Sequence, residues 1–238
     1  MEKTIQRIGI EGGITKIVVP HDGEDVVFAH PSVGPDTYLN VGKRIIEQGM
    51  NVPTGDKTAS LLHSAYCVPE LKDEPEFEDI REIMRNAWLW VFNRNLWTSE
   101  GVYVVQDLKA IGKSQPLNQN ELEKMLEGGK NLGGVRFSKD GKIRFASKGS
   151  YQLKIHTPES LAKDGFMVAS YGIKGAEKLG EVSRKFRLKP RVDFLETNER
   201  EQLLSALGER RLLVDGRLGV SGYGMGGGGD GLAFGVLK

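Results

Sequence analysis

The chain has 238 residues, a formal net charge of +1, 39% hydrophobic residues and 27% charged residues, which is the composition of an ordinary globular protein. No run approaches the roughly 18 consecutive apolar residues that a membrane span needs, and residues 1–10 lack the apolar core of a signal peptide. We therefore expect a cytoplasmic protein with no membrane partner. The single cysteine, Cys67, excludes an internal disulfide and a cysteine-rich zinc site.

Turn and capping residues divide the chain into short strands and helices. Three Asp-Gly pairs, at 22–23, 140–141 and 215–216, lie between strand-forming runs and favour the tight turn of an antiparallel β-hairpin. Capping residues and apolar residues at helical spacing mark the helices. In chain order the predicted elements are strands 14–19 and 25–29, helices 37–48, 54–67 and 76–93, strand 102–106, helix 119–127, strands 135–139 and 142–146, helix 158–163, strands 185–189 and 191–195, helix 198–210, and strands 211–214 and 217–220.

The longest of these helices, over residues 76–93, ends in a cluster of aromatic side chains. Phe77, Ile80 and Met84 fall at helical spacing, and the stretch 87–92 is apolar around the whole predicted helix. Such an end is buried on every side or contributes to an interface. We expect a core position, and the alternative is a homo-oligomer or protein-partner contact through the Trp88–Trp97 region.

Hairpins with helices between them predict an α+β fold of antiparallel β-hairpins packed with five or six helices. The irregular stretch 112–120, which contains Pro116, suggests a boundary between two lobes. The expected division is an acidic N-terminal lobe over 1–115, a basic C-terminal lobe over 116–221 and a glycine-rich tail over 222–238, with one undivided domain as the alternative. Eight glycines within residues 222–235 predict a flexible tail.

Charge is segregated along the chain, and this is its most informative feature. Residues 1–129 hold 13 Lys and Arg against 20 Asp and Glu, a net of −7. Residues 130–191 hold 15 against 5, a net of +10, and residues 192–238 hold 5 against 7, a net of −2. A basic segment that folds onto one face of a protein attracts polyanions. A solvated hairpin, or a basic lobe docked on an acidic one, is the structural alternative.

The Asp140-Gly141 hairpin adds aromatic side chains to this basic segment. A two-residue turn pairs Phe137 with Arg144 and Arg136 with Phe145, so each face carries a ring beside a guanidinium. Bases stack on exposed rings while Lys and Arg neutralise phosphates, which suits a nucleic-acid surface for DNA or RNA. The candidate nucleic-acid-binding residues are Arg136, Phe137, Lys139, Lys142, Arg144, Phe145, Lys148, Lys154, Arg184, Lys185, Arg187, Lys189 and Arg191.

Two glycine-rich segments do not match nucleotide-binding motifs. The run 49–58 has five residues between its glycines and Asp56 before Lys57, where a Walker loop has four residues and lysine directly after the second glycine. We interpret Thr54 to Asp56 as a helix cap. The glycines after residue 222 precede no predicted helix whose N-terminus could hold a phosphate. The sequence therefore leaves the cofactor unknown.

A few residues are candidates for catalysis. Asp36 after Pro35, with Asp107 and Lys109 after a strand, resembles in outline the Pro-Asp and Asp-x-Lys elements of a large superfamily of magnesium-dependent nucleases. Two carboxylates would hold the metal and the lysine would assist a water. His30 lies on a stiff proline-containing loop and is the candidate of a small-molecule enzyme centred on residues 21–36. No histidine pair has metal-ligand spacing on a helix, and no metal site is predicted from them.

The sequence thus leads to one hypothesis with two alternatives. We expect a protein that binds nucleic acid or another polyanion through a basic 130–191 surface, mainly by phosphate contacts. The alternatives are a metal-dependent phosphodiesterase or small-molecule enzyme, and a subunit of a protein assembly. The sequence does not settle whether the protein is an enzyme, which ligand it takes or its oligomeric state.

Overall fold

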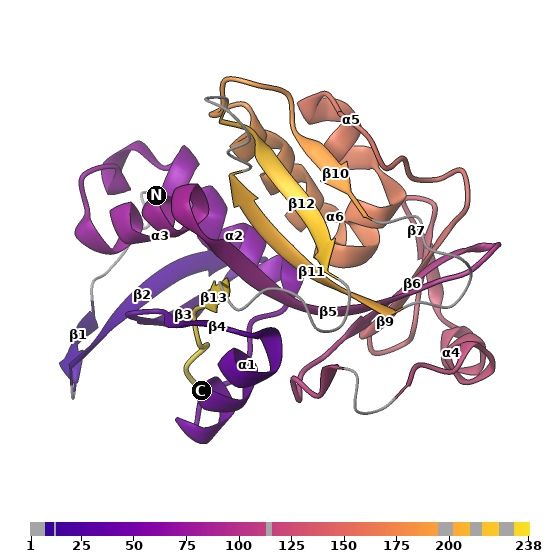
Figure 1. The fold of residues 1–238 in the computed structure, drawn as a ribbon, viewed down its shortest axis with the longest axis horizontal. Coiled ribbons are helices and arrows are strands. Elements are labelled where there is room, and N and C mark those ends of the chain that lie inside the picture. Colours follow the sequence, from indigo (N-terminus) through magenta and orange to yellow (C-terminus); the bar gives the residue numbers. More distant parts are fainter. Residues whose placement is uncertain (1–7, 12, 113–115, 195–201, 210–215, 224–230) are drawn as a thin grey trace.

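A computed structural model describes residues 8–11, 13–112, 116–194, 202–209, 216–223 and 231–238 (Figure 1). Within these residues the chain has an α+β fold with antiparallel hairpins and mixed sheets, which confirms the predicted fold class. The helices are α1 (Tyr38–Glu47), α2 (Gly55–Cys67), the 3-10 turn η1 (Pro69–Leu71), α3 (Pro75–Asn86), α4 (Gln119–Leu126), α5 (Pro158–Lys163) and α6 (Gly165–Ser183). The strands are β1 (Ile8–Glu11), β2 (Ile14–His21), β3 (Glu24–His30), β4 (Val33–Asp36), β5 (Trp88–Trp97), β6 (Gly101–Gln106), β7 (Lys130–Leu132), β8 (Val135–Phe137), β9 (Ile143–Ser147), β10 (Arg191–Asp193), β11 (Gln202–Glu209), β12 (Leu218–Tyr223) and β13 (Gly231–Ala233).

Two sheets organise the described part of the chain. The smaller contains β1, β2 and β3, and the larger follows the order β10-β12-β11-β5-β6-β9-β8-β7, with β13 beside β5 and β4 paired to β13. Most neighbours are antiparallel, whereas β10 with β12 and β13 with β5 are parallel. The larger sheet contains strands from both sides of residue 115 because β6 pairs with β9. The division into two lobes stays a prediction.

Strand β5 is covered on both faces by helices and neighbouring segments. Leu89 and Val91 belong to a large apolar cluster with α2, α3, α6 and the smaller sheet. Trp90 and Phe92 point to the opposite side, where they pack with α1. Farther along the sheet, α4 covers the face of β6 and β9 that carries Tyr103 and Phe145. Trp90, Phe92 and Trp97 therefore lie in the core of this chain, as the favoured interpretation of the sequence expected, and Trp88 packs half-buried beside it.

Turn and cap chemistry predicted the local structure well. The first hairpin turns at Asp22-Gly23, where both residues have positive φ, +51° and +95°, as a tight Asp-Gly turn requires. The hydroxyl of Thr37 accepts a hydrogen bond from Asn40 N at the start of α1. Thr157 and Asn118 cap α5 and α4 in the same way. The hairpin of β8 and β9 has the predicted pairs Arg136–Phe145 and Phe137–Arg144.

Three expectations about regular structure were wrong, and one helix was not predicted. The predicted helix 76–93 ends at Asn86, and residues from Trp88 onward form β5. Residues 202–209 of the predicted helix 198–210 form β11, the neighbour of β5. Both segments are apolar runs buried in a sheet, where periodicity does not distinguish a strand from a buried helix. Residues 185–189 form turns and bends instead of a strand, and α6 was not predicted.

The glycine-rich end of the chain is partly built into the fold. Residues 231–233 form β13 against β4 and β5, and Phe234 is buried beside His30. Gly235 O accepts a hydrogen bond from Ala29 N over 2.8 Å. The prediction of a flexible tail is wrong for these residues, while residues 224–230 and the predicted turn residue Asp215 lie outside the described part. Among the described helices, none has the length and apolar character that crossing a membrane requires.

Shortening buried side chains on either face of β5 tests its position in the sheet. Phe92→Ala should lower the free energy of unfolding by about 3–5 kcal/mol and Leu89→Ala by about 2–5 kcal/mol, because both side chains are almost fully enclosed. Leu39→Ala, at a position that is 41% exposed on α1, is the control and should cost less than about 0.5 kcal/mol. Urea denaturation measures all three. Equal losses at positions 39 and 92 would contradict this placement.

Candidate functional site

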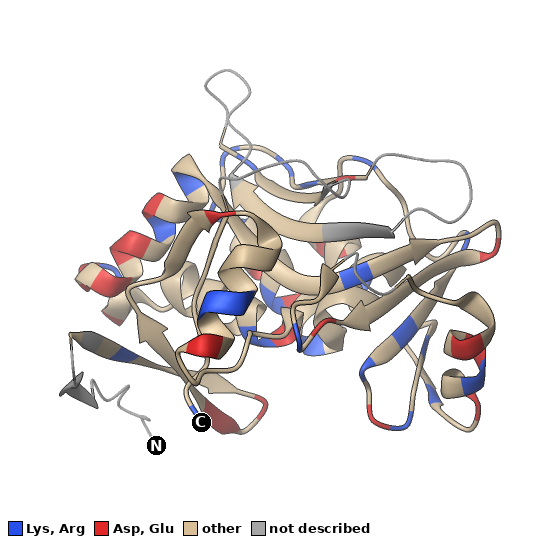
Figure 2. Ribbon diagram, turned by 60° about the horizontal axis from the view of Figure 1, so that its bottom comes forward, with Lys and Arg blue, Asp and Glu red and all other residues tan. Residues whose placement is uncertain are grey.

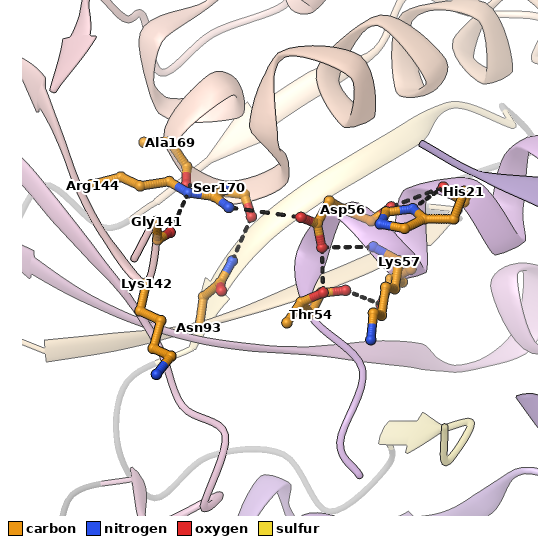
Figure 3. Close-up of polar contacts among 12 residues, drawn as sticks. His21, Thr54, Asp56, Lys57, Asn93, Gly141, Lys142, Arg144, Ala169 and Ser170 are labelled. Atoms are coloured by element: carbon orange, nitrogen blue, oxygen red, sulfur yellow. Dashed lines mark hydrogen bonds and ion pairs between the residues drawn. The ribbon is translucent and has the colours of Figure 1, made fainter. Parts of the chain in front are cut away.

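Arg144 of β9 is the centre of a polar cluster on the α6 side of the large sheet (Figure 3). Its side chain is 8% exposed, and it donates from Nε to Gly141 O and from Nη1 to Ala169 O, each over 3.1 Å. Nη2 lies 3.7 Å from Asp56 Oδ2 in the first turn of α2. Burial lowers the pKa of Arg144, and the charge of Asp56 opposes that change. One guanidinium thus joins the hairpin, α6 and α2.

The first turn of α2 lies directly against a kink in α6. Gly172 interrupts α6 with a φ of +72°, a conformation that favours glycine. Ser170, just before the kink, accepts a hydrogen bond on its carbonyl from Asn93 Nδ2 over 2.9 Å. A Cβ on Gly55 would lie 2.2 Å from the same carbonyl, so glycine permits the close approach. Side chains therefore satisfy carbonyl groups that the kink removes from the regular helix.

The start of α2 already holds an anion, the carboxylate of Asp56. This carboxylate accepts a hydrogen bond from Lys57 N over 2.9 Å and another from the hydroxyl of Thr54. A negative charge at this end of a helix interacts favourably with the helix dipole. A phosphate would meet the Asp56 charge here, which agrees with our interpretation of 54–56 as a helix cap.

Next to Asp56, the hydroxyl of Ser60 lies between two basic side chains. Lys178 Nζ donates to Ser60 Oγ over 2.7 Å, and His21 Nδ1 lies 2.9 Å from the same oxygen. Burial lowers the pKa of Lys178 and that of His21. A serine flanked by bases resembles an activated nucleophile. However, Ser60 is 1% exposed and its hydroxyl donates to Asp56 O over 3.1 Å, so a substrate carbonyl cannot reach it.

The inner end of the polar cluster is closed to solvent as well. Asn93 is 0% exposed and Ser170 is 1% exposed. Their side-chain oxygens Asn93 Oδ1 and Ser170 Oγ are buried and have no hydrogen-bond partner among the described residues. We therefore interpret the cluster around Arg144 as an internal network that positions α2, α6 and the hairpin. Sequence reasoning did not connect these residues, because they lie on five separate segments.

The predicted aromatic and basic faces of the hairpin exist, but they turn inward. The Arg136 guanidinium carbon lies 4.6 Å from the centroid of the Phe145 ring, and that of Arg144 lies 5.3 Å from the centroid of Phe137. Arg136 also makes two hydrogen bonds to Glu123 of α4, at 3.0 and 2.7 Å. Phe145 is 6% exposed. Phe137 is half-buried, with Arg144 over its ring and the large apolar cluster beside it, so each ring of the hairpin already packs against the protein.

The other candidate cations occupy two separate places. Lys139 and Lys142 lie at the hairpin tip, where Lys142 Nζ is 3.4 Å from the Asp140 carboxylate. Lys148 follows the other end of β9, about 20 Å away at the rise of an extended strand. Lys and Arg positions are spread over several sides of the molecule in Figure 2. The net charge of residues 130–191 therefore does not produce a single basic face.

Main-chain hydrogen bonds join two loops, residues 148–157 after β9 and residues 184–190 after α6. His156 N donates to Pro190 O over 2.8 Å, Val192 N donates to Lys154 O over 3.0 Å, and Ile155 pairs with Arg191. We define the basic loop surface as the exposed basic side chains of these two loops that have no ion pair. None of them has a carboxylate partner within 4.0 Å among the described residues. Its members are Lys148, Lys154, Lys185, Arg187 and Lys189. Arg184 and Arg191 are instead paired with Glu159 and Asp193.

The predicted catalytic carboxylates make separate structural contacts. Asp36 accepts hydrogen bonds from Asn40 and Thr37 N and contacts Arg44, and these contacts lower the pKa of its carboxyl. Asp107 is 4% exposed and accepts from Tyr38 Oη over 3.0 Å and from Gly112 N over 2.9 Å. Asp107 thereby holds the loop after β6.

The remaining candidates do not complete a catalytic group. Lys109 is exposed, and His30 Nε2 lies 2.9 Å from Asp79 Oδ2 of α3 while its ring stacks on Phe234. Within the described residues, no group of three or more His, Cys, Asp or Glu side chains is arranged to hold a metal ion. Comparison of this chain with family models, curated proteins and solved structures found no match.

Removing Arg144 should destabilise the protein far more than removing Arg136. Arg144→Ala leaves a half-buried Asp56 and unpaired carbonyl groups, with an expected loss of about 3–5 kcal/mol in the free energy of unfolding. Arg136→Ala removes a pair whose side chains are 41% and 36% exposed, and should cost about 1 kcal/mol or less. Chemical denaturation of both variants provides the comparison. Similar losses would show that Arg144 does not anchor the cluster.

Protonation of His21 should weaken the fold as the pH falls below the ordinary histidine value of 6.5. Burial lowers the pKa of His21, so the unfolded chain binds a proton at a higher pH than the folded chain does. The stability that neutral His21 contributes is present above pH 6.5 and is lost as the pH falls toward the lower folded value. Denaturation at pH 7 and pH 5 should show a larger drop for the wild type than for His21→Gln. A parallel drop in both proteins would refute the assignment.

Proposed function

We propose that this protein binds a polyanion, with nucleic acid as the partner, through the basic loop surface. The observation that carries this proposal is the joining of two loops by main-chain hydrogen bonds, which places five exposed cations without acidic partners on neighbouring segments. Cations that no carboxylate of the protein neutralises are available to phosphates. The hairpin, which we expected to bind nucleic acid, contributes at most its tip.

Binding on this surface would be mainly electrostatic. The rings of Phe137 and Phe145 pack within the protein, so they offer no stacking platform for bases. Lys and Arg side chains on loops contact phosphates and carry little sequence information. We therefore expect similar affinity for unrelated sequences of the same form of nucleic acid, with a strong dependence on salt.

A salt series with fluorescently labelled nucleic acid tests this proposal. If all five cations contact duplex phosphates, the logarithm of the binding constant should fall with the logarithm of the salt concentration with a slope of about −4.5. The triple variant Lys154→Ala, Arg187→Ala, Lys189→Ala should reduce that slope by about 2.7 and weaken binding to unrelated sequences alike. Fluorescence anisotropy on single- and double-stranded DNA and RNA gives both quantities.

A charge-matched variant controls for the loss of three positive charges. Lys43→Ala, Lys124→Ala, Lys238→Ala removes exposed lysines on other segments and should leave the slope unchanged. The double variant Lys139→Ala, Lys142→Ala reports separately on the hairpin tip. Absence of binding at low salt, or equal losses in the two triple variants, would reject the basic loop surface as the binding site.

A further inference from the structure

A cavity of about 510 Å³ opens between the end of α2, the η1 turn, one side of α3 and Lys185. This volume is within the range of cavities that hold small organic ligands. The cavity lies on the N-terminal half of the chain except for Lys185, and none of the predicted catalytic residues lines it. Its walls combine a charged side with a partly apolar side.

The charged side of the cavity is positive. Its lining includes four cationic and two acidic side chains, a net of +2, namely Lys72, Arg81, Arg85 and Lys185 against Asp73 and Glu78. Glu78 is held between two arginines, with Oε2 at 2.7 Å from Arg81 and Oε1 at 2.9 Å from Arg85, and these contacts lower the pKa of its carboxyl. Lys72 and Lys185 have no ion pair with a described carboxylate. Their charges are therefore available to an anion.

One wall of the cavity is rigid. The Arg81 side chain is 10% exposed and donates to Ala65 O over 2.6 Å and to Lys72 O over 2.5 Å. These bonds fix the turn that carries Lys72 against the end of α2. A cation presented on a fixed backbone loses less freedom on binding than one on a mobile loop.

The other wall offers an aromatic and apolar surface. Tyr66 lines the cavity with Val68 and Pro69, and its ring packs against Phe186 with centroids 5.2 Å apart. Aromatic rings bind flat apolar groups through stacking and the burial of apolar area. A ligand that fits both walls carries a negative group on one side and a flat body on the other.

We propose that this cavity binds a small phosphate monoester with a flat ring system, of which a nucleoside 5′-monophosphate is a suitable probe. Lys72 and Lys185 contact the phosphate, and the ring system lies along Tyr66. This inference is based on the residues that line the cavity and does not depend on nucleic-acid binding, although Lys185 also belongs to the basic loop surface.

Cys67 lines the same cavity and provides a reporter, since it is the single cysteine of the chain. Burial raises the pKa of its thiol, while the nearby positive charge of Lys185 acts in the opposite direction. A raised thiol pKa is unsuited to a catalytic nucleophile, but the half-buried thiol remains open to slow alkylation. The rate of alkylation by iodoacetamide, followed by intact-mass measurement, therefore reports on Cys67 alone.

The test compares the alkylation rate of Cys67 with adenosine 5′-monophosphate, adenosine, inorganic phosphate or no addition. At about ten times its dissociation constant the nucleotide should slow alkylation about elevenfold, because the fraction of free protein falls by that factor. Adenosine or phosphate at the same concentration should protect much less. Protection by phosphate equal to that of the nucleotide would overturn the ring-binding wall, and equal protection by adenosine would overturn the phosphate contact. No protection by the nucleotide would reject the site.

Variants assign the effect to the cavity. Lys72→Ala and Lys185→Ala should each raise the dissociation constant of the nucleotide about tenfold, which corresponds to about 1.4 kcal/mol and reduces the protection from about elevenfold to about twofold. Lys163→Ala, at an exposed lysine in the last turn of α5, should leave it unchanged, and a melting curve of each variant confirms folding. The triple variant Lys154→Ala, Arg187→Ala, Lys189→Ala should bind nucleic acid more weakly but keep the full nucleotide protection. Failure of the cavity and failure of the basic loop surface are thus separate results.

Discussion

The burial of one charged group, the guanidinium of Arg144, fixes how the main helices meet the large sheet. A charge that is 8% exposed needs an opposing charge and hydrogen-bond acceptors, because an unpaired buried charge is strongly destabilising. Those partners come from the turn at Gly141, from α6 at Ala169 and from α2 at Asp56. Apolar packing tolerates small adjustments, whereas a shift of either helix here would break a contact of a buried charge. The kink at Gly172 and the close approach at Gly55 are the backbone conditions for this arrangement.

Within the basic segment, most arginines contact an acidic residue of the protein and several lysines do not. Arginine offers several donors in a planar fork and suits enclosed or bidentate contacts, whereas lysine carries a compact, strongly hydrated charge. Four arginines, at 136, 144, 184 and 191, each contact an acidic residue of the protein, whereas Arg187 is exposed without one among the described residues. Two lysines, Lys142 and Lys174, are paired with Asp140 and Asp22. The lysines at 148, 154, 185 and 189 stay exposed and have no such contact among the described residues. The net charge of +10 over residues 130–191 is therefore larger than the positive charge that is available to a partner. The exposed lysines without an acidic contact are the side chains that favour contacts with phosphates.

Sequence reasoning succeeded where one short segment determines the outcome. The positive φ values at Asp22-Gly23, the Thr37 and Thr157 caps and the Phe137–Arg144 pairing follow from residues close in the chain. Sequence reasoning was wrong for β5 and β11. Both strands are buried between segments that lie far away in the chain, so their apolar runs do not alternate as those of a half-exposed strand do. Sequence reasoning also missed α6, whose glycine at 172 interrupts the helical pattern. Neither the Arg144 cluster nor the cavity beside Tyr66 carries a local motif, because each is assembled from segments far apart in the sequence.

The cavity illustrates why charge summed along a chain does not predict binding. Three of its four cations belong to residues 1–129, the segment with a net charge of −7, yet its walls carry +2. At physiological ionic strength, charges more than about 8 Å apart are largely screened from one another in solvent. A ligand in the cavity therefore interacts with Lys72 and Lys185 and with a Glu78 carboxylate that two arginines already neutralise. Asp73 also lines the cavity and opposes an anion there, and Glu82 pairs with Arg85. What favours an anion here is the pairing of Glu78 with two arginines, which leaves Asp73 as the one acidic side chain of the lining that opposes Lys72 and Lys185.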